Sequence, residues 1–297
     1  MKDIIIEDSI NSDEINPKSE RDMKCAPSND FKDGSCIPLE VMVNMAEAYN
    51  QDFKDSSIIL HSKLESLNPE KYKRYLVKEF GNRLANVCDT QRCWVKQKFT
   101  RNMKKELKKY ANKHIFRPSG PEGKFEWLNT YNINDVMGQY EKKYDDFKFL
   151  GAVPIDFDDL PQLGLKDMDF NKLKTKGINK IGIVFNLDEH YKSGSHWVAM
   201  FGDLKDGKIF FSDSYGVEPE KRIRKLMRKT ARFYKEESGH MPDVKHNKKR
   251  HQFGNSECGV YSINFILRLL KGESFENITE NRTSDTAVNK CRKTYFQ

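Results

Sequence analysis

Residues 252–270 read QFGNSECGVYSINFILRLL, and this stretch decides the fold. Apolar side chains lie on nearly every side of a helix that would begin at Cys258 and end at Leu270, which indicates a helix buried inside the protein. The polar turn 254–257 brings Cys258 to the first turn of this helix. Unpaired backbone N–H groups at a helix start favour negative charge, and a thiolate is the nucleophilic form of cysteine. Cys258 is therefore a candidate nucleophile, with a buried structural cysteine as the alternative.

A cysteine nucleophile needs an imidazole to move its proton and a third group to hold the ring. An Asp-Gly pair at 206–207 predicts a hairpin that joins strands over 196–204 and 208–214. Antiparallel pairing, with a slight offset, brings His196 at the start of one strand near Asp213 at the end of the other. Spacing alone does not predict that both residues meet the cysteine.

Gln252 stands six residues before Cys258. A neutral amide donor at this position could join the backbone N–H of Cys258 in an oxyanion hole. Asp203 competes with Asp213 for the third position, but it lies inside the first strand of the predicted hairpin. The order His, Asp, Gln, Cys along the chain therefore indicates a catalytic site with a cysteine nucleophile.

These segments resemble the superfamily of SUMO-specific proteases and adenovirus proteases, and within it the polyprotein-processing proteases of African swine fever virus and giant DNA viruses. The resemblance rests on Gly-Ser-His-Trp-Val-Ala at 194–199, Phe-Ser-Asp-Ser-Tyr-Gly at 211–216 and Gln252-x5-Cys258-Gly-Val-Tyr. It extends upstream to Asp-Gly-Ser-Cys at 33–36, the turn at 117–118 and Trp-Leu-Asn at 127–129. It implies an α+β fold with a papain-like or adenain-like cysteine protease core, preceded by a helical N-terminal region.

The resemblance also implies site residues. The base of the family falls on His196, the nucleophile on Cys258 and the oxyanion glutamine on Gln252. The third catalytic residue is Asp213, where the African swine fever enzyme carries asparagine. No cofactor and no metal are implied.

Two tryptophans match positions that wall a narrow substrate tunnel in the SUMO-protease relatives. These are Trp127, which the African swine fever enzyme lacks, and Trp197. Two indole faces close to an extended backbone admit glycine and exclude a Cβ, which predicts cleavage after Gly-Gly. The alternative is that both tryptophans are core residues.

Periodicity and turn residues divide the chain into an acidic lead-in over 1–35, a helical N-terminal domain over 36–116 and a catalytic core over 117–297. We expect helices and strands in the following places. Helices are predicted over 39–49, 69–80, 96–113 and 219–236, and strands over 181–185, 196–204, 208–214 and 244–253.

The chain has 52 Lys and Arg against 44 Asp and Glu, so its net charge is +8. Residues 96–113 carry 8 basic groups against 1 acidic group, and residues 220–250 carry 12 against 4. These basic segments predict contact with a polyanion, DNA first, with a solvated lysine-rich surface as the alternative. No apolar run is long enough for a membrane span, and no signal peptide is expected. Most of the 6 cysteines are therefore expected to be reduced.

These features lead to three functional hypotheses. The first is a viral cysteine endopeptidase that cuts structural polyproteins, such as capsid or core precursors with Gly-Gly sites, during virion maturation. Such an enzyme would act in the virion and in the virus factory of the host cytoplasm, and would not be secreted or bound to membranes. The second hypothesis is an isopeptidase that removes SUMO-like modifiers, and the third is a basic virion protein that binds nucleic acid on an inactive protease fold.

Overall fold

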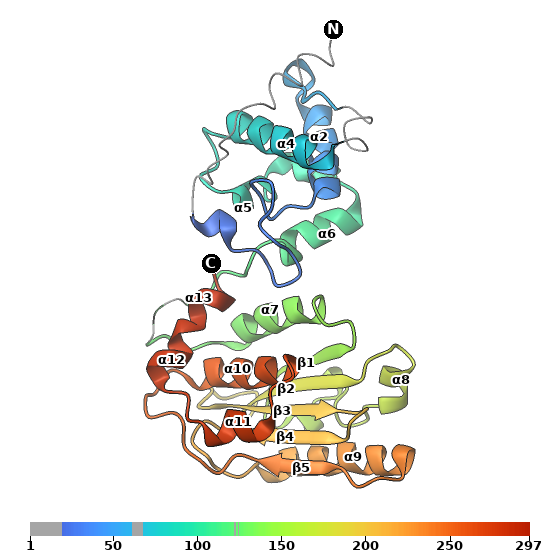
Figure 1. Ribbon diagram of the computed structural model, residues 1–297, viewed down its shortest axis with the longest axis vertical. Helices are drawn as coiled ribbons and strands as arrows, with labels where there is room; N and C mark the ends of the chain where they lie inside the picture. The colour runs from blue at the N-terminus through green and yellow to red at the C-terminus, as the bar shows by residue number, and fades with distance from the viewer. Residues whose placement is uncertain (1–19, 61–67, 122, 124) are drawn as a thin grey trace. The chain divides into compact units, whose positions relative to one another are not determined.

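The computed structural model describes residues 20–60, 68–121, 123 and 125–297. The chain forms two compact units (Figure 1). Unit 1 comprises Met1–Pro118 with Gln297, and unit 2 comprises Ser119–Phe296.

The described part of unit 1 is helical, as the sequence predicts. Its helices are η1 (Glu20–Met23), α2 (Leu39–Asp52), η2 (Lys54–Ser56), α4 (Pro69–Arg83), α5 (Gln91–Trp94), η3 (Lys98–Asn102) and α6 (Lys105–His114). Helix α4 has Pro69 in its first turn, and the side chain of Asn68 accepts a hydrogen bond from the Lys71 N–H. Buried apolar side chains from α2, α4 and η3, including Met45, Phe80 and Phe99, form the core of this unit.

The prediction of one helix over 96–113 is wrong. Residue Met103 has extended backbone angles between η3 and α6, and its side chain is buried in the core of unit 1. Just after it, the Lys104 N–H donates to Oδ1 of Asn44 on α2. Packing and this side-chain contact therefore interrupt a segment whose local sequence favours a continuous helix.

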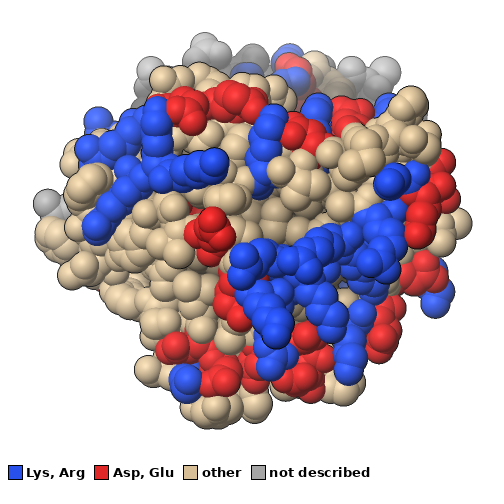
Figure 2. All heavy atoms as spheres, turned by 90° about the horizontal axis from the view of Figure 1, so that it is seen from below, with Lys and Arg blue, Asp and Glu red and all other residues tan. Residues whose placement is uncertain are grey.

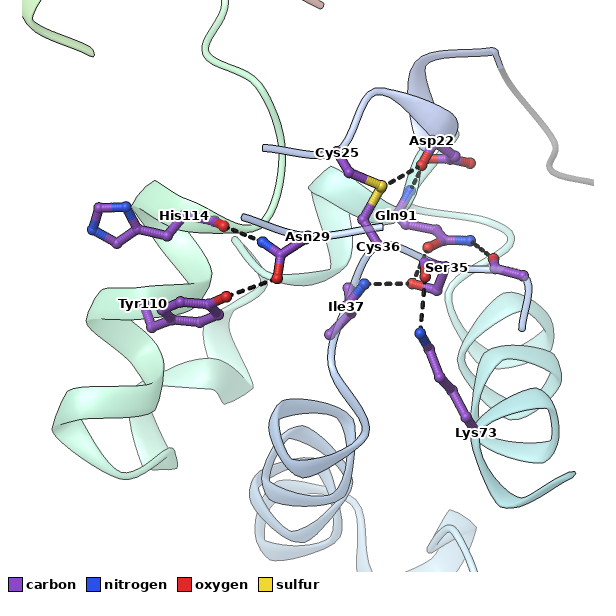
Figure 3. Close-up of a disulfide and its surroundings, with 11 residues drawn as sticks. Asp22, Cys25, Asn29, Ser35, Cys36, Ile37, Lys73, Gln91, Tyr110 and His114 are labelled. Carbon is purple, nitrogen blue, oxygen red and sulfur yellow. Dashed lines mark hydrogen bonds between the residues drawn. A yellow bond between two sulfur atoms is a disulfide. The ribbon is translucent and has the colours of Figure 1, made fainter. Parts of the chain in front are cut away.

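Two cysteine pairs in unit 1 are disulfides, so the expectation that most cysteines are reduced is also wrong. Cys25 pairs with Cys36 and Cys88 with Cys93, with Cα–Cα distances of 5.3 and 5.4 Å. Figure 3 shows the first pair beside a network of side-chain and backbone hydrogen bonds. The fold brings these cysteines within bonding range, which their sequence spacing does not reveal.

Unit 2 contains a five-stranded sheet with the order β1-β2-β3-β4-β5 (Figure 1). The strands are β1 (Phe147–Pro154), β2 (Lys180–Asn186), β3 (Trp197–Asp203), β4 (Lys208–Ser212) and β5 (Asp243–His246). Strand β1 is parallel to β2 and β5 is parallel to β4, whereas β2, β3 and β4 pair in antiparallel fashion. The predicted hairpin forms β3 and β4, and Gly207 in its turn has a φ of 68°.

Helices cover both faces of this sheet. Helices α7 (Thr130–Glu141) and α10 (Cys258–Leu270) pack on one face, and α9 (Lys221–Ser238) packs on the other. The remaining helices of unit 2 are η4 (Phe157–Asp159), η5 (Pro161–Leu163), α8 (Phe170–Lys174), α11 (Phe275–Glu280), α12 (Asp285–Lys290) and α13 (Arg292–Tyr295). Alternating side chains of β3 point to opposite faces: Ala199 packs in the core formed with α10, and Met200 in the core formed with α9. Helix α10 is buried along nearly its whole length, as predicted.

The predicted strand over 244–253 is shorter than expected. Strand β5 ends at His246, after which the N–H groups of His251 and Gln252 both donate to the carbonyl oxygen of Ser214. This departure from the sheet carries Gln252 toward the turn before α10. Among the described residues, no helix combines the length and the apolar character that a membrane crossing requires.

Candidate active site

The β3–β4 hairpin brings His196 and Asp213 together. His196 immediately precedes β3 and Asp213 immediately follows β4. Nε2 of His196 lies 2.7 Å from Oδ1 of Asp213, and their side chains are only 10% and 4% exposed. The juxtaposition expected from antiparallel pairing is therefore present, in a position largely closed to water.

Asp213 is held by neighbours on both sides. Its Oδ1 atom also accepts a 2.8 Å hydrogen bond from the backbone N–H of Tyr215. The side-chain amide of Asn247 accepts from the Asp213 N–H at 2.9 Å and donates to the Asp213 carbonyl oxygen at 2.7 Å. The ring of Tyr215 stacks on the imidazole of His196, with centroids 4.6 Å apart. The carboxylate and the imidazole therefore have fixed positions.

Asp203, the competing candidate for the third catalytic position, makes different contacts. It ends β3 at the hairpin turn, where its Oδ1 accepts from the N–H groups of Lys205 and Asp206 at 3.0 and 2.9 Å. Its carboxylate caps the turn. The structure brings Asp213, and not Asp203, to the imidazole of His196.

Cys258 is the first residue of α10 and is buried. Burial of the His196 ring opposes its charged form, but hydrogen bonds to Asp213 and Cys258, and the charges of both, raise the pKa of His196 to about 9. The imidazole therefore interacts with both the carboxylate of Asp213 and the thiol of Cys258. Gly259 allows the start of α10 to lie close to Leu128, because a Cβ at this position would lie 3.0 Å from the Cβ of Leu128.

Gln252 is fully buried, and its side chain has a fixed orientation. The Ser214 hydroxyl donates to its Oε1 at 2.6 Å, and its Nε2 donates to the carbonyl oxygen of Gly254 at 2.9 Å. This amide therefore lies along the turn that precedes Cys258. An amide nitrogen carries two N–H donors, so one remains for a further acceptor.

The two tryptophans line one pocket but differ in exposure. The pocket has a volume of about 320 Å³ and lies between residues 127–130 and the segment that leads into β3. Trp197 is buried, and its Nε1 donates to the carbonyl oxygen of Leu128 at 2.8 Å, which matches its alternative interpretation as a core residue. Trp127 is 49% exposed, so its ring is available to a ligand.

Sequence reasoning missed Arg292 of α13, whose side chain is fully buried. Its Nη2 atom donates to the carbonyl oxygens of Glu126 at 2.7 Å and Ser256 at 3.0 Å. Burial lowers the pKa of Arg292, whereas the charges of Glu257, Glu126 and Cys258 act in the opposite direction. No pattern in the polar C-terminal sequence distinguishes this arginine from a surface residue.

Comparisons with known proteins identify relatives of this chain. Residues 168–296 match the C-terminal catalytic domain of the Ulp1 protease family. A thiol protease of Acanthamoeba polyphaga mimivirus is 39% identical over 280 residues, which cover 92% of this chain and 93% of that protein. A protein named SUMO-1 cysteine protease from African swine fever virus (isolate Pig/Kenya/KEN-50/1950) is 22% identical over 227 residues, or 71% of this chain and 83% of the relative.

The fold also has a counterpart among solved structures. The crystal structure of an African swine fever virus protease superimposes with a TM-score of 0.61 at 19% identity, covering 92% of this chain and 95% of that one. The fold and the relatives together define a cysteine protease. The chain belongs to the Ulp1 protease family, and the predicted fold class is confirmed.

Proposed function

We propose that this cysteine protease uses Cys258 as nucleophile, His196 as base and Asp213 as the residue that orients the base, with Gln252 in the oxyanion hole. The observation that carries the assignment is the imidazole of His196, which interacts with Asp213 and Cys258 at once. Because Nε2 of His196 is engaged by Asp213, Nδ1 is the nitrogen available to the thiol.

The reaction follows from these positions. His196 takes the thiol proton, and the Cys258 sulfur attacks the carbonyl carbon of the scissile bond. The negative oxygen of the intermediate accepts hydrogen bonds from the Cys258 N–H and from the free N–H of Gln252. The imidazolium gives its proton to the leaving amine, which leaves a thioester. Water then attacks the thioester, with His196 again accepting a proton, and the carbon–sulfur bond breaks. The imidazolium returns this proton to the Cys258 sulfur, and the product leaves as a carboxylate after losing its own proton to solvent.

The substrate that we propose is a viral structural polyprotein, such as a capsid or core precursor, cut after Gly-Gly. Trp127 and Trp197 border the pocket beside the segment that leads to His196. In this proposal an extended substrate backbone lies along the pocket, where the aromatic walls favour a residue without a Cβ, glycine, on the acyl side of the cut. The curated relatives that cover 92% and 71% of this chain are viral proteases, which supports a role in virion maturation within the virus factory.

The alternative is a deconjugase that removes a SUMO-like modifier, because such modifiers also end in an extended glycine tail. The name of the African swine fever virus relative points to SUMO-1, and that name applies to the relative. Purified protein should be incubated separately with a capsid precursor containing Gly-Gly-Xaa sites and with a SUMO conjugate. We expect cleavage of the precursor at Gly-Gly; cleavage of the conjugate alone would support the deconjugase.

The third hypothesis, a binding protein on an inactive protease fold, makes a different prediction in the same assay. It requires that neither substrate is cut, even at high enzyme concentration. Mapping the new N-termini in the precursor by mass spectrometry distinguishes specific cleavage by this chain from contamination, provided that a Cys258→Ala preparation is processed in parallel.

A further inference from the structure

Helix α9 presents a cationic groove on the sheet face opposite to α10. Eight of its residues are Lys or Arg, whereas its acidic residues are Glu236 and Glu237 near its end. A groove of about 410 Å³ lies between this helix and residues 157–166. Figure 2 shows Lys and Arg side chains gathered in a broad patch on the face seen from below.

Some of these charges are satisfied within the fold. Arg222 forms ion pairs with Asp158 and Asp159 at one end of the groove. The Nζ atom of Lys229 donates to the carbonyl oxygens of Lys166 and Met168, both at 2.9 Å. These two residues attach α9 to the loop across the groove and are structural.

Four other cations at the groove are unsatisfied. Lys225, Arg228 and Arg232 are exposed on α9, and Lys166 is exposed on the opposite wall. Within the described part of the chain, their charged groups have no ion-pair or hydrogen-bond partner. A concave surface lined by charges of one sign concentrates the electrostatic field and attracts counter-ions.

We propose that this groove binds the phosphodiester backbone of a nucleic acid, independently of base sequence. Lys225, Arg228 and Arg232 follow each other by three and four residues, so they form one row on the helix. This row is about 10 Å long at 1.5 Å per residue, whereas one DNA strand advances about 3.4 Å per phosphate. The row therefore faces about three consecutive phosphates, and arginine forks match phosphate oxygens well.

The shape of the groove supports this occupant. Its floor is apolar, formed by Phe157, Leu165 and Leu226, so the long basic side chains can lie along it with their charged ends at the rim. The cations continue beyond the groove at Lys221 and Lys235, near the two ends of α9. An extended polymer with regularly spaced charges fits such a row better than one acidic side chain does.

The site is separate from the proposed catalytic residues. Ile223, Leu226 and Met227 of α9 pack against one side of the sheet, and α10 packs against the other. Binding at the groove therefore does not cover the side of the sheet that carries Cys258, and the proposal does not depend on the proposed protease substrate.

The test compares the full-length chain with two variants of equal charge change. The first combines Lys225→Gln, Arg228→Gln and Arg232→Gln; the control combines Lys105→Gln, Lys108→Gln and Lys109→Gln on α6, in the other basic segment. The affinity of each protein for a labelled oligonucleotide is measured by fluorescence anisotropy over a range of salt concentrations. The measurement is made once with the oligonucleotide single-stranded and once with it annealed into a duplex.

We expect the α9 variant to lose about tenfold or more in affinity near 0.1 M salt, and its slope of log K against log salt to fall by about 2 to 3. The α6 variant should change affinity less than about threefold, because we assign the contact to the α9 groove and not to the segment 96–113 that the sequence also predicted. Circular dichroism and peptide hydrolysis should match the unmodified chain for both. Binding unchanged in the α9 variant, equal losses in both variants, or tighter binding of polyglutamate than of DNA at equal charge would each overturn the proposal.

Discussion

The guanidinium of Arg292 donates a 3.0 Å hydrogen bond to the carbonyl oxygen of Ser256, two residues before Cys258. The same nitrogen donates to the carbonyl oxygen of Glu126, next to Trp127. One buried cation thus connects the turn that leads to the proposed nucleophile with the segment that carries the exposed tryptophan. Arg292 is a positioning residue, since it acts through the two backbone segments that it holds.

Replacing Arg292 should separate the effect of its hydrogen bonds, which position the backbone, from the effect of its positive charge. Arg292→Lys keeps a positive charge but cannot reach all the carbonyl oxygens at once, so we expect kcat to fall about tenfold with a smaller change in KM. Arg292→Met leaves the carbonyls unsatisfied and should lower the free energy of unfolding by about 2 to 4 kcal/mol. Steady-state kinetics and thermal denaturation measure both effects. Arg224→Lys, on the surface of α9, is the control; the same loss there would contradict the assignment.

Cys258 should be required for hydrolysis. Cys258→Ala removes the sulfur that forms the thioester in the proposed mechanism, so cleavage of a Gly-Gly precursor should fall by at least about a thousandfold. The matched control is Cys291→Ala, which removes the other free cysteine among the described residues. Iodoacetamide should inactivate the enzyme, with the adduct on Cys258 by mass spectrometry. Residual cleavage of the Cys258→Ala variant near the normal rate would exclude this residue as nucleophile.

The pH above which kcat/KM falls should depend on Asp213. The pKa of His196 is raised to about 9, so its imidazolium persists below this pH and is lost above it. The stabilisation that this charge gives the fold is complete below the ordinary pKa of 6.5 and disappears as the pH rises through about 9. Asp213→Asn removes one carboxylate charge, which should move the alkaline limb of kcat/KM to lower pH by about one unit.

The control for this profile is Asp203→Asn, because Asp203 is the other aspartate of the hairpin. Its carboxylate contacts turn N–H groups and not the imidazole, so the alkaline limb should stay in place. A shift with Asp203→Asn and none with Asp213→Asn would reverse the assignment of the third residue.

Trp127 should determine selectivity for glycine. Its ring is 49% exposed at the pocket, so Trp127→Ala can open the pocket without emptying the core. We expect the preference of kcat/KM for Gly-Gly over Ala-Ala peptides to fall about tenfold, because the wall that excludes a Cβ is lost. Tyr131→Ala removes a nearby exposed ring and is the control. An unchanged preference in Trp127→Ala would show that other groups select glycine.

The two disulfides of unit 1 should contribute unequally to stability. Cys25–Cys36 spans 11 residues and Cys88–Cys93 spans 5. The chain-entropy model gives about 3 kcal/mol for the longer loop and about 2 kcal/mol for the shorter. Denaturation of the paired Cys→Ser variants, each with and without a reducing agent, measures these values. A reducing agent that leaves the unmodified chain's denaturation midpoint unchanged would contradict both contributions.

The sequence by itself determined the elements whose pattern is local. The apolar run after Cys258 predicted a buried helix, and the Asp-Gly turn predicted the pairing of β3 with β4. From that pairing the meeting of His196 with Asp213 followed, because antiparallel strands joined by a short turn end at the same edge of the sheet. Local patterns erred where distant contacts intervened, as at Met103, whose burial ends a basic helical segment.

Only the tertiary structure decided the contacts between residues far apart in the chain. Nothing in the spacing of 196, 213 and 258 predicts that the imidazole interacts with both the carboxylate and the thiol, because the position of α10 against β3 depends on packing across the whole core. The disulfides and Arg292 likewise depend on segments that meet through the fold. Sequence patterns record the periodicity of one segment, whereas a site is made by side chains that several segments bring together.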